Sequence, residues 1–142
     1  MTDDNVKNVI NQINASLPER KLLQLIDRTS LSADLKAILV DLAKITIQVG
    51  ETVVSIGKGI LKFVFELVKS FPNLTLGILV AVVLSTIISA VPVIGALFGG
   101  IIAPLLLAIG IGKGALADIA DNNLKSKIEG LTNDFSDLEK AM

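Results

Sequence analysis

The side chains that could do chemistry in this chain are carboxylates, amines, guanidinium groups, hydroxyls and amides, because its 142 residues include no His and no Cys. Without these two residue types, zinc sites of the usual kind, haem and iron–sulfur ligation and thiol nucleophiles are excluded. A general base near neutral pH would have to be a strongly shifted carboxylate or Lys. We therefore expect neither an enzyme nor a bound cofactor or metal.

The charged residues with the most regular spacing lie in the first half of the chain. From position 41 onward, charged and polar residues recur every three or four positions, which predicts one narrow polar stripe along a helix. The stripe residues that could line a pore or vestibule are Asp41, Lys44, Glu51, Lys58 and Lys62. The alternative is that the stripe forms the solvent or headgroup side of a helix lying at a membrane surface.

The element that positions this stripe follows from the hydropathy pattern. Nearly all other residues from Ile38 to Val68 are apolar, so we expect a long helix over residues 33–71, covered by protein or lipid on most of its circumference. Small residues here and further along the chain are candidates for close helix packing. They are Ala43, Gly50, Gly57, Gly95, Gly99 and Gly100. For the glycines before residue 60 the alternative is a bend or break, since a mid-helix Gly costs about 1 kcal/mol relative to Ala.

A hydrophobic hairpin is expected next, over residues 72–114. Residues 70–112 carry no charge, and within them Leu74–Ala90 and Val93–Gly112 are apolar runs of 17 and 20 residues. As helices these runs would be about 26 and 30 Å long, close to the roughly 30 Å of a bilayer's hydrocarbon core. Pro92 supplies the turn between them.

The charges that flank this hairpin predict its orientation. Lys69 precedes it and Lys113 follows it, whereas its tip carries no charge. Because positively charged flanks remain in the cytoplasm, we expect an inner-membrane protein with both termini on the cytoplasmic side.

Amphipathic helices are expected at both ends of the chain, over residues 1–32 and 115–142. In the C-terminal segment the apolar residues are spaced by four and three positions, which predicts a seam for a contact within the chain or between subunits. The residues of this seam are Leu124, Ile128, Leu131, Phe135 and Leu138. A cytosolic protein partner could bind through these terminal helices.

These features together predict an all-α membrane protein. It would contain a two-helix transmembrane hairpin, a long amphipathic helix before it and short amphipathic helices at both ends. The formal net charge of −1 leaves no basic footprint for nucleic acid. The expected partners are the lipid bilayer and further copies of the chain.

Three functions fit this organisation. The first is a self-associating integral membrane protein that forms a pore or channel-like oligomer and could act as a membrane-permeabilising effector. The second is a structural anchor or scaffold that recruits a cytosolic partner. The third is a two-state pore former, because a long uncharged hairpin among amphipathic helices resembles the organisation of colicin-type channel domains over residues 74–112. That resemblance implies a hairpin that is buried in water and inserts on triggering.

Overall fold

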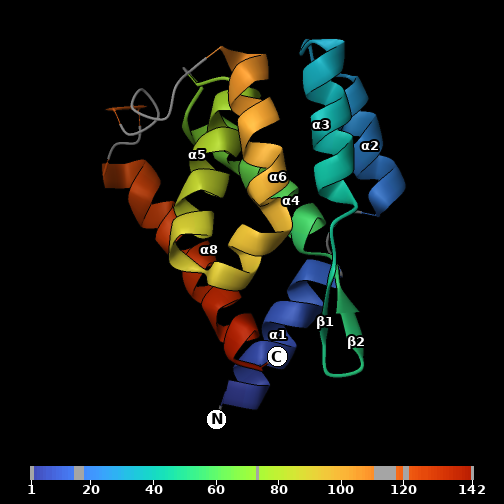
Figure 1. The fold of residues 1–142 in the computed structure, drawn as a ribbon, viewed down its shortest axis with the longest axis vertical. Coiled ribbons are helices and arrows are strands. Elements are labelled where there is room, and N and C mark those ends of the chain that lie inside the picture. The colour runs from blue at the N-terminus through green and yellow to red at the C-terminus, as the bar shows by residue number, and fades with distance from the viewer. Residues whose placement is uncertain (1, 15–17, 73, 111–117, 120–121, 142) are drawn as a thin grey trace.

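The computed structural model describes residues 2–14, 18–72, 74–110, 118–119 and 122–141. Within these residues the chain forms seven helices and a pair of short strands (Figure 1). In chain order they are α1 (Thr2–Asn14), α2 (Glu19–Asp27), α3 (Ala33–Ala43), β1 (Ile47–Val49), β2 (Thr52–Val54), α4 (Ile56–Ser70), α5 (Leu76–Ala90), α6 (Pro92–Ile109) and α8 (Asn122–Ala141). The prediction of a mostly helical protein is confirmed.

The prediction of one long helix over residues 33–71 is wrong. The helix α3 ends at Ala43, an antiparallel strand pair follows, and α4 begins at Ile56. The physical reason lies in the β-branched residues between the two helices, which favour extended backbone. Gly50, with φ of 62°, begins the two-residue turn between β1 and β2, where positive φ suits glycine better than any other residue.

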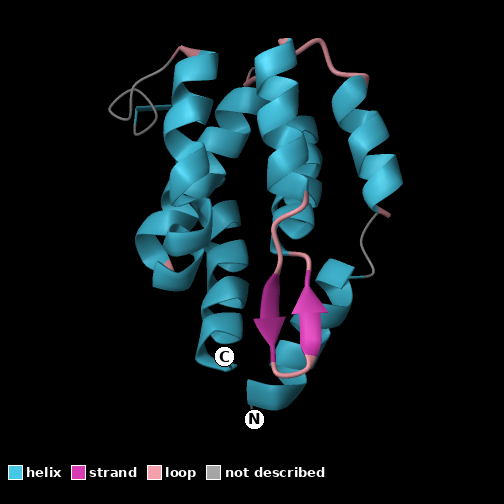
Figure 2. Cartoon of the chain, turned by 45° about the vertical axis from the view of Figure 1, so that its right-hand side comes forward, coloured by secondary structure: helices cyan, strands magenta, loops and turns pink. Residues whose placement is uncertain are grey.

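The strand pair projects at one end of the molecule beside α1 (Figure 2). Asn14, at the end of α1, holds it there with both atoms of its side-chain amide. Its Nδ2 donates to the carbonyl oxygen of Val53 at 3.3 Å, and its Oδ1 accepts from the backbone N–H of Ser55 at 3.3 Å. These bonds connect the first helix to the point where β2 passes into α4.

Gly57 lies where α4 comes closest to the end of α3. Its backbone N–H donates to the carbonyl oxygen of Ile45 at 3.0 Å, and a Cβ at this position would overlap the carbonyl oxygen of Leu42. The two alternatives for the glycines of this region therefore apply at different positions. The chain breaks away from helix before Gly50, and two helices approach closely at Gly57.

The helix α5 forms the centre of the molecule, packed against α4, α6 and α8. Most of its side chains are buried, including those of Leu79, Val80, Val83, Leu84 and Ile87. The helix α3 packs against α2, α4 and α6. The uncharged α5 is thus enclosed by other helices of the same chain.

A single residue, Val91, separates α5 from α6, and the two helices pack against each other as a hairpin. Pro92 is the first residue of α6, a position that proline favours because its missing N–H would have no helical partner. Gly110, with φ of 72°, ends α6 in the left-handed conformation that is typical after a helix. Two helices joined at Pro92 are as predicted.

The terminal helices α1 and α8 pack against each other (Figure 1). Four of the five predicted seam residues of α8 are buried and Leu131 is half-buried. Because α8 also contacts α5, the seam makes a contact within the chain. Of the predicted C-terminal segment, residues 115–117, 120–121 and 142 lie outside the described residues.

Candidate functional site

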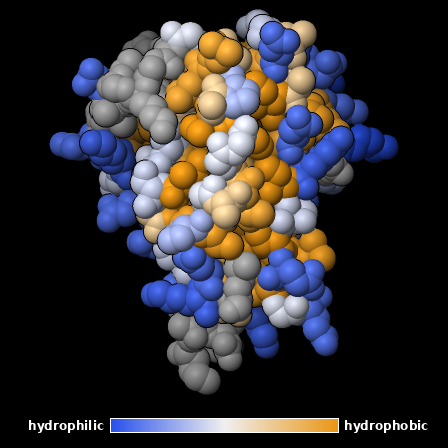
Figure 3. Space-filling model, in the orientation of Figure 1, coloured by the Kyte–Doolittle hydropathy of each residue, from blue (hydrophilic) through white to orange (hydrophobic). Residues whose placement is uncertain are grey.

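An exposed apolar surface runs along one side of α6. Eight of its residues are exposed. Apart from Pro92 at the start of the helix, their spacing of three or four positions places them on one face. We call this the α6 face; its residues are Ala96, Leu97, Gly99, Gly100, Ala103, Pro104 and Leu107. Leu107 retains 84% of its surface and Leu97 retains 38%. The hydrophobic area in the middle of Figure 3 lies over this helix.

The opposite side of α6 is packed against the protein. Ile94, Phe98 and Leu105 are buried there, where α6 contacts α5 and α3. Only 17% of its 18 residues are buried in total. A core helix of a water-soluble domain would be mostly buried, so α6 is as apolar as a core helix but is not covered like one.

By length and composition, α6 is the one helix within the described residues that could cross a membrane. The helix α5 is equally uncharged but has 15 residues. The two halves of the hairpin therefore differ in their surroundings. The protein covers α5, whereas the α6 face is exposed.

The five residues predicted to line a pore do not share one helix. Asp41 and Lys44 are exposed at the end of α3, and Glu51 is exposed in the turn between the strands. Lys58 and Lys62 are half-buried on α4. The break in the predicted long helix thus distributes the polar stripe over three elements.

The small residues predicted to pack helices are also in different surroundings. Ala43 and Gly57 are buried in the contact between α3 and α4. Gly50 lies in the exposed turn described above. A Cβ on Gly95 would lie 3.3 Å from the carbonyl oxygen of Ile88, so this glycine is near the turn of the hairpin. The remaining two predicted residues, Gly99 and Gly100, belong to the α6 face, where a Cβ would meet no atom within 4 Å.

Of the two lysines predicted to flank the membrane segment, Lys69 is exposed in the last turn of α4. Lys113 lies outside the described residues. The start of the hairpin therefore has a positive charge at its surface.

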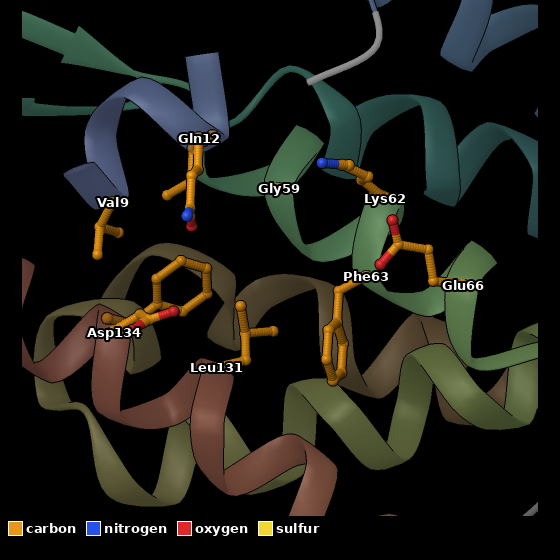
Figure 4. A pocket seen from close by; sticks show the side chains of 10 residues that line it. Val9, Gln12, Gly59, Lys62, Phe63, Glu66, Leu131 and Asp134 are labelled. Carbon is orange, nitrogen blue, oxygen red and sulfur yellow. The ribbon is translucent and has the colours of Figure 1, made fainter. Parts of the chain in front are cut away.

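A pocket of about 180 Å³ lies between α1, α4 and α8 (Figure 4). Apolar side chains, among them Phe63 and Leu131, form much of its lining. Lys62 and Glu66 are neighbours on α4, and Asp134 comes from α8 on another side of the pocket. The pocket therefore brings together one amine and two carboxylates, a grouping that spacing in the sequence did not indicate.

Burial in this pocket raises the pKa of the Asp134 carboxyl above its ordinary value, and the nearby Asp137 carboxylate raises it further. A raised pKa means that the folded state holds this proton more tightly than the unfolded state. The contribution of Asp134 to the free energy of unfolding is therefore greatest below the ordinary pKa of an aspartate, about 3.9. It falls as the pH rises towards the raised pKa of the folded state, because the unfolded state ionises first.

We expect Asp134→Asn to stabilise the protein at neutral pH. The gain should be below about 1 kcal/mol, since Asp134 is only partly buried and solvent screens much of its interaction. Thermal unfolding followed by circular dichroism at a series of pH values measures this effect. The gain over the wild type should shrink towards acid pH; a gain that is the same at every pH would contradict the role of ionisation.

Two further contacts link α8 to other elements and were not predicted from the sequence. The Nζ of Lys127 donates to the Ser70 hydroxyl at 3.2 Å and lies 5.8 Å from the centre of the Phe71 ring. At the other end of α8, a carboxylate oxygen of Glu139 accepts from the backbone N–H of Val93 at 3.2 Å. Both contacts join residues more than 40 positions apart, which no local pattern reveals.

Among the described residues, no group of three or more Asp or Glu side chains is placed to hold a metal ion. Comparison with protein-family models, with curated proteins and with solved structures finds no match to this chain. The α6 face and the buried α5 beneath it are the features of the described chain that bear most directly on function.

Proposed function

We propose that this protein is a membrane-active, two-state pore former. In water, α5 is enclosed by helices and the α6 face is exposed. On meeting a bilayer, the hairpin α5–α6 leaves its covering helices, enters the lipid and associates with hairpins of other copies. The observation that carries this proposal is that α6 combines the length and composition of a membrane span with burial of only 17% of its residues.

The α6 face supports the first step, which is contact with the bilayer. It contains no charged or hydrogen-bonding side chain, so it loses no polar contact with water when lipid covers it. Removing apolar surface from water is favourable by about 25 cal/mol per Å². Because this face is already exposed, the protein can gain that free energy before any helix moves.

The surroundings of α5 support the second step. Lipid tails are about as apolar as the leucine side chains around α5, so exchanging helix neighbours for lipid keeps its side chains out of water. Two of its hydroxyls already bond within the helix. The Thr86 hydroxyl donates to the carbonyl oxygen of Val82 at 2.9 Å, and the Ser89 hydroxyl donates to that of Ser85 at 2.9 Å. These two groups can enter lipid with their hydrogen bonds intact.

Helix length is compatible with insertion but slightly short. At 1.5 Å per residue, 15 and 18 residues correspond to about 22 and 27 Å. A hairpin of this size would thin the bilayer locally or stop within the far headgroup layer. The orientation expected from Lys69 and Lys113, with both termini in the cytoplasm, belongs to this inserted form.

Self-association is supported by the small residues of the α6 face. Gly99, Gly100 and Ala103 lie close together on it, and small residues let transmembrane helices approach closely. In the fold described above, a Cβ added at Gly99 or Gly100 would meet no atom within 4 Å. The oligomer of the membrane form is therefore proposed to use the α6 face.

Vesicles of phosphatidylcholine and phosphatidylglycerol that contain a self-quenched dye test this proposal. We expect the full chain to float with the vesicles in a density gradient. We also expect dye release to rise more steeply than linearly with the amount of bound protein, as an oligomeric pore requires. Binding without release would support an anchor instead, and protein that stays in the aqueous fraction at neutral and acidic pH would contradict membrane activity.

A further inference from the structure

A charged side chain of α8 holds the tip of the hairpin. Glu139, in the last turn of α8, accepts a hydrogen bond from the backbone N–H of Val93 at 3.2 Å. In the described part of the chain, this is the one hydrogen bond between a charged side chain and either hairpin helix.

The start of α6 depends on this contact for its capping. Val91, which occupies the N-cap position, has no side-chain hydrogen bond to the helix, and Pro92 has no N–H to satisfy. The first N–H groups of a helix have no partner within it, and a carboxylate beside them is favourable because that end of the helix carries partial positive charge. Glu139 therefore supplies to α6 a cap that the residues before α6 do not provide.

Glu139 is unfavourably placed for its own helix. The last turn of a helix carries partial negative charge, so a carboxylate there is repelled. The side chain of Glu139 is half-buried, and the preceding residue, Leu138, is buried in the core. The contact with α6 therefore explains the position of Glu139, whereas the stability of α8 does not.

We propose that Glu139 is an autoinhibitory latch that holds the hairpin tip against α8 until the C-terminal turn of α8 moves away. This inference depends on the function proposed above. The tip must pass through the headgroups for the hairpin to insert, and a bound carboxylate cannot accompany it into hydrocarbon without a large cost. Release of the Val93 amide from Glu139 therefore precedes insertion.

Replacing Glu139 tests the latch. With dye-loaded vesicles of phosphatidylcholine and phosphatidylglycerol, we expect Glu139→Ala to lower the protein concentration for half-maximal release about tenfold, equivalent to about 1.4 kcal/mol. We expect a smaller shift for Glu139→Gln, which keeps an oxygen acceptor without the charge. The matched control is Glu129→Ala, which removes an exposed carboxylate from the same helix and should behave as the wild type.

A second measurement in the absence of lipid separates the latch from the proposed function. Hydrogen–deuterium exchange of the segment around Val93 should be faster in Glu139→Ala than in the wild type and in Glu129→Ala. If the wild type releases dye and Glu139→Ala matches it, the latch is wrong and pore formation stands. If no variant releases dye, pore formation is wrong, and unchanged exchange at the tip would then reject the latch as well. Should Glu139→Ala fail to fold, Glu139→Gln takes its place in both measurements.

Discussion

Replacing Gly57 with Ala is expected to cause a larger loss of stability than Gly→Ala at any other glycine in the described part of the chain. The new Cβ would overlap the carbonyl oxygen of Leu42, which is backbone and cannot rotate away as a side chain could. The helices α3 and α4 must then separate, and the hydrogen bond from the Gly57 N–H to the Ile45 carbonyl oxygen must lengthen. Overpacking of this kind costs about 3 kcal/mol. Urea unfolding followed by circular dichroism measures the loss.

The control for this substitution is Gly130→Ala, in the middle of α8. A Cβ there meets no atom within 4 Å, so the only change is the helix propensity, which favours Ala over Gly by about 1 kcal/mol. The same methyl group is thus expected to destabilise at one position and to stabilise at the other. Equal stability of Gly57→Ala and the wild type would contradict the close approach of α3 and α4.

The break in the predicted long helix explains why part of the polar stripe was misassigned. Polar residues at intervals of three or four positions fit one face of a helix, and this spacing continues through residues 45–54, so it predicts helix there. The β-branched residues in this stretch and Gly50 were the signals for strands. From the sequence alone they indicate a bend or break but not a strand pair, because three-residue strands are too short to show a clear alternation of apolar and polar residues.

The hairpin could be predicted because its signals are local. An absence of charge, two apolar runs and Pro92 between them determine two adjacent helices. Which of the two would be covered by protein could not be predicted, because α5 and α6 are equally apolar. Hydropathy measures preference for leaving water and does not distinguish a protein interior from lipid.

The contacts of α8 illustrate a second limit. Its apolar seam was predicted from spacing, and four of its five residues are buried. The partner of Glu139, however, is a backbone amide 46 positions away, and a backbone amide has no sequence signature. The raised pKa of Asp134 could not be predicted either, because it results from burial in a pocket between helices that are distant in the chain.

A charge placed in the middle of α6 is expected to weaken membrane binding strongly while leaving the fold in water intact. Gly100 is near the centre of this helix, and a Cβ there would meet no atom within 4 Å, so Gly100→Asp adds an exposed side chain. An aspartate at the centre of a membrane helix costs about 2.5–3.5 kcal/mol. Binding to dye-loaded vesicles, measured by flotation, should therefore weaken about 100-fold, and dye release should fall with it.

Two variants separate the charge from its position. Gly100→Ala adds a methyl group without charge and should bind vesicles nearly as the wild type does. Gly130→Asp places the same carboxylate on α8, where a side chain also has open space, and should leave binding unchanged because α8 stays outside the hydrocarbon. Circular dichroism should show all three variants folded. Dye release by Gly100→Asp at the wild-type level would mean that α6 does not enter the bilayer, and the hairpin could then not be the inserted element.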